Sequence, residues 1–344
     1  MNIAAVAFTD CGMALGERLC EARPGVELAR CPRGGLAAWA ADAFSTHEAL
    51  VFIGAVGIAV RAIAPHIRAK TRDPAVVVLD ETGTYAIPIL SGHLGGANDL
   101  ALALARELGA LPVVTTATDL HGSFAVDSWA RRQGLQVVNP QRIKWISARI
   151  LAGETVRLKS LYPIAGSPPA QVVFADEDYD ILVGHRSRGR SEALRLVPAC
   201  VTAGIGCRRG TTEEAVSAAV EEALRKSGCH PAALRDAASI DLKADEPGLL
   251  AFCAGRGISL HTYRAEELAG VAGSFSSSAF VRRTTGVDNV CERAAVLACG
   301  GRLISRKEAL NGVTVALALR EPALAFDEAA PRAQASLCSN EEEV

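Results

Sequence analysis

A histidine lies among glycines in the stretch LSGHLGGAND, residues 90–99. Glycines that lead directly into a helix leave backbone N–H groups without intrahelical partners, and such groups favour a carboxylate, a phosphate or a developing oxyanion. We therefore predict that the amides of Gly95 and Gly96 bind an oxyanion. His93 can act as a base or a donor, since an unperturbed imidazole titrates near pH ~6.5. The alternative is a tight turn in which the histidine makes only local hydrogen bonds.

Polar side chains accompany this loop in the sequence. The stretch TTATDLHGSFAVD, residues 115–127, ends a predicted strand, and the carboxyl ends of strands line the ligand crevice in open α/β sheets. Asp119 in that stretch is a second candidate base. The side chains predicted to contact a substrate here are those of Ser91, Asn98, Thr115 and Thr116. The alternative is that they cap the helices that follow them.

Two cationic stretches indicate an anionic ligand. RAIAPHIRAKTRD, residues 61–73, contributes Arg61 and Lys70, and a guanidinium can pair a carboxylate through two hydrogen bonds. GIGCRRGTT, residues 204–212, is one residue too long for the dinucleotide-binding fingerprint but suits an anion cradle before a capped helix. Its predicted binding residues are Arg208, Arg209 and the cap Thr211. The alternative for both stretches is a solvated charged loop.

The composition excludes several classes of protein. The net charge of −2, from 36 basic and 38 acidic residues, provides no overall field for nucleic acid or an anionic membrane as partner. The longest uncharged apolar run, residues 50–60, is about half the length that a bilayer requires. Ten cysteines are scattered without a C-x-x-C pair, and the N-terminus carries no basic leader. We therefore expect reduced thiols, no metal site and a cytoplasmic location.

The elements that must position these residues alternate between strands and helices. Short apolar runs separated by helical patterns fill residues 1–135, which is typical of a layered α/β domain. The three residues ETG between AVVVLD and TYAIPIL predict a hairpin and therefore a mixed sheet. After the glycines, Leu100, Leu104 and Leu108 predict one apolar helix face, and Gly109 predicts its end.

The pattern along the chain predicts four segments. Residues 1–135 form the N-terminal α/β domain, and residues 136–196, which are turn-rich and basic, form a small middle module or an elaborate linker. Residues 197–320 return to an α/β pattern, and residues 321–344, with six acidic residues and one basic residue, predict a disordered acidic tail. The expected fold class is α/β, with two layered α/β/α domains with mixed sheets joined by the middle module.

Whole stretches of this sequence are more specific than their spacing. GIAVRAIAPHIRAKTRDPAVVVLDETG, LSGHLGGANDLALALA and VVTTATDLHGSFAVD resemble the N-terminal domain of the CbiG family, the cobalt-precorrin-5A hydrolases of anaerobic cobalamin biosynthesis. AGIGCRRGTTEEAV, IDLKADEPGLL and GVDNVCERAAVLACGG resemble its C-terminal domain, which also occurs in CobE-like proteins. The resemblance covers residues 45–320.

The resemblance implies a reaction and a substrate. In this family water opens the δ-lactone of a ring-contracted cobalt macrocycle, and the extruded carbon leaves with its methyl group as acetaldehyde, giving cobalt-precorrin-5B. The implied substrate is a corrinoid with many acetate and propionate groups, which agrees with the cationic stretches. The family implies no cofactor beyond the cobalt inside the substrate. Ala279 departs from the acidic residue that the family pattern suggests before Phe280, so no catalytic role is carried over to that position.

These observations lead to a mechanistic hypothesis. His93 is the base that activates water and later deprotonates the freed alcohol, with Asp119 as the alternative, and chemistry is expected in residues 1–135 with substrate binding in residues 200–320. The acidic partner of the base is left open among Asp73, Asp80, Glu81, Asp119 and Asp127. The rival function is a non-catalytic protein that binds or channels corrinoid intermediates. The oligomeric state is also open, with a homodimer as one option.

Overall fold

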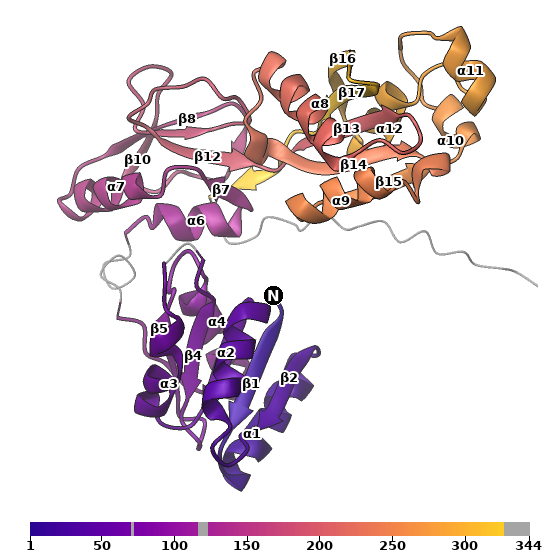
Figure 1. The fold of residues 1–344 in the computed structure, drawn as a ribbon. Coiled ribbons are helices and arrows are strands. Elements are labelled where there is room, and N and C mark those ends of the chain that lie inside the picture. Colours follow the sequence, from indigo (N-terminus) through magenta and orange to yellow (C-terminus); the bar gives the residue numbers. More distant parts are fainter. Residues whose placement is uncertain (70–71, 116–122, 327–344) are drawn as a thin grey trace, which may run out of the picture. The chain divides into compact units, whose positions relative to one another are not determined.

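The computed structural model describes residues 1–69, 72–115 and 123–326 (Figure 1). The chain divides into two units, one of residues 1–131 and 143–154, the other of residues 132–142 and 155–344. Three predicted site residues, Lys70, Thr116 and Asp119, lie outside the described residues. Within the described ranges, no helix is both long and apolar enough to cross a membrane.

The first unit is built on a six-stranded sheet with the order β2-β1-β3-β4-β5-β6. Strands β1 to β4 are parallel, β5 is antiparallel to β4, and β6 is parallel to β5. The predicted hairpin and the mixed sheet are therefore confirmed. The strands are β1 (Ile3–Ala7), β2 (Val26–Arg30), β3 (Ala49–Ile53), β4 (Ala75–Leu79), β5 (Tyr85–Leu90) and β6 (Leu111–Pro112).

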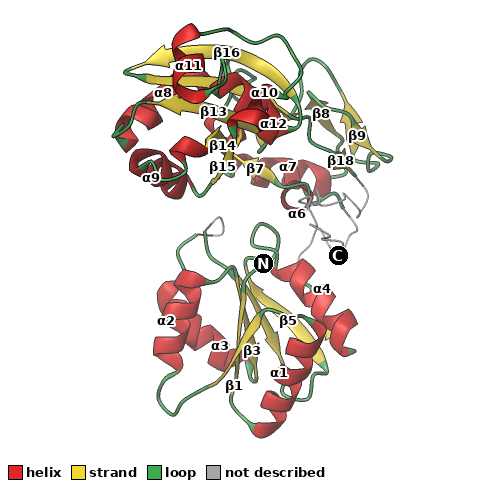
Figure 2. Cartoon of the chain, turned by 90° about the vertical axis from the view of Figure 1, so that its right-hand side faces the viewer, coloured by secondary structure: helices red, strands yellow, loops and turns green. Residues whose placement is uncertain are grey.

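Helices cover both faces of this sheet (Figure 2). The side chains of β1 alternate between the faces: Ala5 packs in a cluster with α1 and α4, whereas Val6 packs in a cluster with α2 and α3. This is the predicted α/β/α layering, since strand side chains point alternately to the two faces. The helices are α1 (Asp10–Ala22), α2 (Leu36–Thr46), α3 (Val56–Ile63) with the 3-10 turn η1 (Ala64–His66), and α4 (Ala97–Leu108). Two more, α6 (Val126–Arg132) and α7 (Gln141–Leu151), include the boundaries between the units.

Helix α4 confirms the prediction made from its leucines. Leu100, Leu104 and Leu108 are buried on one face of the helix, and Gly109 ends it in the left-handed conformation at φ 77°. At the other end, Gly96 is the N-cap at φ 85°, and no side chain caps the helix. The N-cap position is therefore a glycine and not Ser91 or Asn98.

The second unit contains two larger sheets. The first has the order β10-β8-β11-β12-β7, in which only β7 is antiparallel to its neighbour. Its strands come mainly from the turn-rich segment 136–196: β7 (Leu135–Val137), β8 (Val156–Ser160), β10 (Val172–Phe174), β11 (Ile181–Val183) and β12 (Leu194–Pro198). A short ladder pairs β9 (Ile164–Ala165) with β18 (Leu324–Ala325), so part of the predicted tail is a strand.

The second sheet of this unit has the order β15-β14-β13-β17-β16. Strands β13, β14 and β15 are parallel, and β17 runs antiparallel to both β13 and β16. The strands are β13 (Val201–Cys207), β14 (Leu234–Ile240), β15 (Ser259–Tyr263), β16 (Arg302–Leu310) and β17 (Val313–Leu319). The helices are α8 (Glu213–Lys226), α9 (Pro247–Arg256), α10 (Ala265–Ala269), α11 (Ala279–Thr285) and α12 (Cys291–Cys299), with 3-10 turns η2 (Pro231–Ala233) and η3 (Asp241–Lys243).

Helix α12 lies very close to this sheet. A Cβ atom at Gly204 would come within 1.8 Å of the Cys291 carbonyl oxygen, so only glycine allows the start of the helix to pack there. The same contact holds the N-terminal end of α12 beside the middle of β13. Both units therefore belong to the α/β class, which is the predicted fold class.

Candidate functional site

The glycine loop and the first cationic stretch meet at one edge of the sheet in the first unit. Leu90 at the end of β5 pairs with Val76 near the start of β4, and the Ser91 hydroxyl donates to the Asp73 carbonyl oxygen over 3.0 Å. Both carboxylate oxygens of Asp73 accept the Arg68 N–H at 3.1 Å. We call this the loop edge. It is the carboxyl end of β5 and the amino end of β4, because β5 runs antiparallel to β4.

The third predicted motif leads to the same edge. Strand β6 pairs in parallel with the beginning of β5, and the Val113 N–H donates to the Ala86 carbonyl oxygen. Thr115 therefore continues alongside β5 toward the loop edge. The expectation that strand carboxyl ends line the site applies to β5 and β6, whereas β1, β3 and β4 begin at this edge.

His93 pairs with an aspartate from α6. Its Nδ1 lies 3.3 Å from Asp127 Oδ2, and the two side chains are 14% and 9% exposed. Burial by itself would raise the pKa of Asp127, but the hydrogen bond and charge of His93, with the Ser128 N–H, outweigh it and lower that pKa. A carboxylate held in this way fixes the imidazole ring and leaves Nε2 as the nitrogen able to accept a proton.

The other described acids bond elsewhere. The Asp80 side chain accepts the N–H groups of Thr82 and Tyr85, and Glu81 accepts the Thr9 hydroxyl, all at the opposite end of β4. Of the acids left open in the sequence, Asp127 is therefore the described one that meets the histidine.

The glycine loop leaves fewer amides available than the sequence suggested. The Gly96 N–H donates to the His93 carbonyl oxygen at 3.0 Å, and the Ala97 N–H donates to the Ser91 carbonyl oxygen at 3.1 Å. The prediction that Gly96 supplies an oxyanion donor is therefore wrong in this conformation, because its hydrogen already closes the turn. No backbone partner for the Gly95 N–H is found in the described part of the chain.

Packing also explains why this loop contains glycine. A Cβ at Gly95 would lie 2.3 Å from the Ser91 Cβ, and one at Gly96 would lie 2.8 Å from the Arg131 guanidinium carbon. Arg131 forms an ion pair with Asp99 in the first turn of α4. Because Arg131 follows Asp127 by one helical turn, α6 contacts the loop and the helix through two side chains. Asn98, at the same turn, is 6% exposed.

Arg61 is placed differently from the loop residues. It lies on α3, and its Nη1 donates to the Gly57 carbonyl oxygen in the same helix at 3.3 Å. The structure shows no bond between its side chain and His93 among the residues that it describes. Its role in binding substrate stays a prediction.

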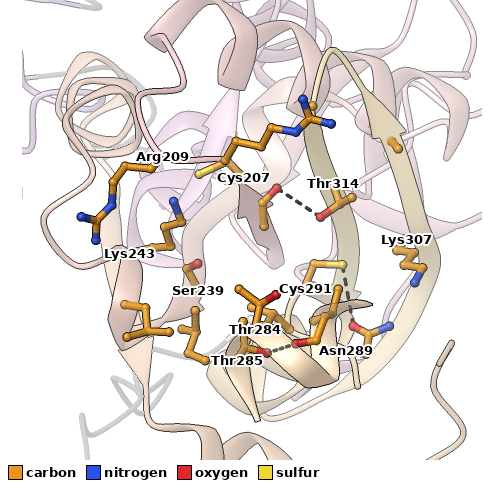
Figure 3. A pocket seen from close by; sticks show the side chains of 18 residues that line it. Cys207, Arg209, Ser239, Lys243, Thr284, Thr285, Asn289, Cys291, Lys307 and Thr314 are labelled. Carbon is orange, nitrogen blue, oxygen red and sulfur yellow. Dashed lines mark hydrogen bonds between the residues drawn. The ribbon is translucent and has the colours of Figure 1, made fainter. Parts of the chain in front are cut away.

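The second unit contains a cavity of 640 Å³ (Figure 3). It lies at the carboxyl ends of the parallel strands β13 and β14, and α11, the start of α12 and the β16–β17 hairpin complete its wall. Its lining combines cationic, hydroxyl, thiol and apolar groups: Gly206, Cys207, Arg208, Arg209, Ser239, Ile240, Leu242, Lys243, Val281, Thr284, Thr285, Asn289, Val290, Cys291, Lys307, Ala309, Gly312 and Thr314.

Charge around this cavity is strongly one-sided. Four of its lining residues are cationic, namely Arg208, Arg209, Lys243 and Lys307, and none is acidic. Lys243 Nζ lies 2.8 Å from the Glu246 carboxylate, and that carboxylate also accepts the Gly210 N–H. The pKa of Glu246 is lowered, mainly because of the hydrogen bond from Lys243. The Lys243–Glu246 pair therefore stabilises the turn that contains Gly210. Three cations remain without an acidic partner in the described part of the chain.

The two cysteines of the cavity are neutral thiols. Burial raises the pKa of Cys291 to about 11 and also raises that of Cys207. All nine cysteines that the structure describes are free thiols. Among the described residues, no group of three or more histidines, cysteines and acids could hold a metal ion.

The prediction that Thr211 caps the helix after this turn is wrong by one residue. Thr212, not Thr211, is the N-cap of α8, and its side chain accepts the Ala215 N–H. The Thr211 hydroxyl instead donates to the Arg208 carbonyl oxygen at 2.7 Å. It therefore stabilises the turn that carries both predicted arginines.

Two important residues were not chosen from the sequence. Asp127 was one of several acids, and only the position of α6 selects it. Lys307 lies in the stretch RLISRKEAL, which alternates poorly, and only the pairing of β16 with β17 brings it to the cavity.

One α/β unit carries a histidine–aspartate pair and the other a cavity lined by cations, an arrangement suited to chemistry on an anionic small molecule. The model for cobalamin synthesis G N-terminal matches residues 38–119, and that for cobalamin synthesis G C-terminus matches residues 201–318. A cobalt-precorrin-5A hydrolase from Salmonella typhimurium is 36% identical over 340 residues, which is 92% of this chain and 97% of that protein. The chain therefore belongs to the CbiG family of cobalt-precorrin-5A hydrolases.

Two further relatives agree with this assignment. A cobalt-precorrin-5A hydrolase from Priestia megaterium is 30% identical over 298 residues, covering 80% of this chain and 79% of that protein. Protein CobE from Sinorhizobium sp. is 36% identical over 118 residues, covering 33% of this chain and 77% of that protein. The resemblance stated from the sequence is confirmed.

Proposed function

We propose that this chain hydrolyses the δ-lactone of cobalt-precorrin-5A and releases acetaldehyde, giving cobalt-precorrin-5B in anaerobic cobalamin biosynthesis. The observation that carries the proposal is the 36% identity with a named hydrolase across 92% of the chain. The named relatives that match most of the chain are enzymes of cobalamin biosynthesis, and this chain is one as well. The rival function of a non-catalytic corrinoid carrier is not favoured.

His93 is the proposed general base. With Nδ1 directed at Asp127, 3.3 Å away, its Nε2 can take a proton from the water that attacks the lactone carbonyl. Asp127 acts as a positioning residue, because a fixed carboxylate holds the ring and stabilises the imidazolium that forms. General-base assistance of this kind is typically worth about 10²–10⁴-fold in rate. Asp119 remains the alternative base.

The Gly95 amide is the proposed donor to the carbonyl oxygen as negative charge develops on it. One donor of this kind contributes about 3–4 kcal/mol in known oxyanion sites. Gly96 is left out of this role because its N–H donates within the loop.

The second step breaks a carbon–carbon bond. Ring opening leaves a carboxylate and an alcohol, and loss of the alcohol proton lets the carbon–oxygen double bond of acetaldehyde form as the bond to the macrocycle breaks. The electron pair released enters the conjugated macrocycle. The proposal therefore needs no resident cofactor, and the cobalt belongs to the substrate. We place the reaction in the cytoplasm, since the described thiols are free.

A His93→Ala variant tests the base. Incubated with cobalt-precorrin-5A, it is expected to release acetaldehyde at least about 10²-fold more slowly than the unmodified chain, measured with an alcohol dehydrogenase couple. His261→Ala is the matched control, because His261 also faces an aspartate, Asp236, at 3.6 Å but lies in the second unit outside the cavity. Near-normal release from His93→Ala would eliminate the histidine as base.

A further inference from the structure

We propose that the cavity of the second unit binds the acetate and propionate side chains of the tetrapyrrole substrate, with Arg208 and Lys307 as the principal carboxylate-binding residues. The identity of the ligand rests on the proposed function. The existence and chemistry of the site rest on the cavity itself.

The charge of the cavity selects a polycarboxylate. Arg208 and Arg209 are exposed and Lys307 is half-buried, and none of the three has an acidic partner in the described residues. Lys243 is already neutralised by Glu246, so it contributes less to ligand binding. Figure 3 shows Arg209 and Lys243 on one side of the cavity and Lys307 on the opposite side. A ligand with carboxylates at several positions can therefore meet cations on both sides at once.

Lys307 is held in place by a buried acid. Its backbone N–H donates to the Glu292 carboxylate at 2.9 Å, and the same carboxylate accepts the N–H and hydroxyl of Ser276 at 2.8 and 2.7 Å. Glu292 is fully buried at the start of α12. The register between β16 and β17 shifts between Ser305 and Glu308, so Lys307 lies in an irregular part of the strand. Such irregularities commonly re-aim a side chain beside a functional site.

The hairpin that follows Lys307 at the end of β16 lies against Arg208. Asn311 and Gly312 form its two-residue turn with φ of 50° and 81°, the left-handed pair that favours Asn-Gly in tight hairpins. A Cβ at Gly312 would lie 3.7 Å from Arg208 Cδ, so the arginine stem passes over the turn. One strand therefore carries Lys307, and its hairpin lies against Arg208.

The remaining lining suits the body of a large ring. Ile240, Leu242, Val281, Val290 and Ala309 present apolar surface to the cavity. The Ser239 and Thr314 hydroxyls donate to carbonyl oxygens of β13, at 2.7 and 3.1 Å, so their donors are not available to a ligand. The 640 Å³ volume lies within the ~300–1,000 Å³ of ordinary small-molecule sites. An apolar body with carboxylates at its margin is the chemistry of a tetrapyrrole with acetate and propionate groups.

The test measures binding separately from turnover. Uroporphyrin III, a stable tetrapyrrole with acetates and propionates, is titrated into the full-length chain and followed by its fluorescence. Coproporphyrin III, which keeps the propionates but has methyl groups in place of the acetates, is the comparison probe. Uroporphyrin is expected to bind more tightly, and its affinity is expected to fall as salt rises.

Three variants locate the site. Lys307→Met and Arg208→Met are each expected to weaken uroporphyrin binding about tenfold or more, since each removes a charge-assisted contact. Arg302→Met is the matched control, because Arg302 is an exposed cation of the same strand that does not line the cavity. Replacing Lys307 or Arg208 leaves no buried acid unpaired. All three variants are therefore expected to have the same melting temperature.

The outcomes separate the two proposals. If Lys307→Met and Arg208→Met bind uroporphyrin as tightly as Arg302→Met does, the cavity assignment is overturned whatever the activity. If the binding pattern is as expected and the variants also raise the KM for cobalt-precorrin-5A with kcat retained, the cavity is a substrate site. If the unmodified chain releases no acetaldehyde, the proposed function fails, and the uroporphyrin titration still decides the cavity.

Discussion

Replacing Asp127 by asparagine removes one charge and almost no volume. The Ser128 N–H donates to Asp127 Oδ1 at 3.0 Å, and His93 Nδ1 faces the other oxygen at 3.3 Å. In Asp127→Asn the amide oxygen keeps the bond from Ser128, so the NH₂ group turns toward His93. An amide N–H directed at Nδ1 favours the imidazole tautomer in which the proton is on Nε2. In that tautomer Nε2 cannot accept a proton from water. We therefore expect kcat to fall about 10²–10⁴-fold, the full worth of the base.

The same substitution has a smaller effect on stability. It exchanges a hydrogen bond to a charged group for a neutral one, so the free energy of unfolding is expected to fall by at most about 1.5–3 kcal/mol. Acetaldehyde release at saturating cobalt-precorrin-5A gives kcat, and urea denaturation gives the stability. Asp236→Asn is the control, since Asp236 also faces a histidine, His261. A folded Asp127→Asn protein with kcat within a few-fold of the unmodified chain would refute the orientation argument.

Three further predictions concern stability. Gly96→Ala is expected to lower the free energy of unfolding by at least about 1–2 kcal/mol in urea denaturation, because φ is 85° there and Arg131 blocks the new methyl group. Thr212→Ala is expected to cost about 1 kcal/mol and Thr211→Ala less, since Thr212 caps α8; equal losses would contradict the cap. Burial would raise the pKa of Glu292, but bonds from Lys307 and Ser276 lower it, so its carboxylate stabilises the fold above its unfolded pKa near ~4.3. That stability is lost as the pH falls through the lowered pKa, and Glu292→Gln should show a shallower acid dependence of unfolding than the unmodified chain.

Local patterns were sufficient for much of the first unit. The short ETG connection forces β4 and β5 into a hairpin, and the leucine spacing of α4 identifies its buried face. Strand β2, with the sequence VELAR, shows only a weak sequence pattern because it lies at the sheet edge and is only partly buried. The strands of segment 136–196 are mostly three to five residues long, too short for a period to show.

The candidate site residues were predictable only where they are neighbours in the sequence. His93 and the arginine pair were visible because glycines and charges adjoin them in the sequence. Asp127 lies 34 positions from the histidine, and the bond between them depends on where α6 packs. Lys307 reaches the cavity through the pairing of β16 with β17, almost a hundred residues after Arg208. The use of the Gly96 hydrogen inside its own turn is a matter of backbone angles, which residue types alone do not specify.

The reversal of β5 decides which end of the first sheet carries the proposed chemistry. Because residues 80–84 turn the chain back directly, the loop of His93 emerges beside Asp73 and the beginning of β4. A helical crossover in place of that turn would make β5 parallel and would deliver the same loop to the opposite rim, next to Thr9 and Glu81. A short reverse turn, remote from the proposed reacting groups, thus determines at which end of the sheet the proposed site lies. Moving LSGHLGGAND onto another sheet would require moving this turn as well.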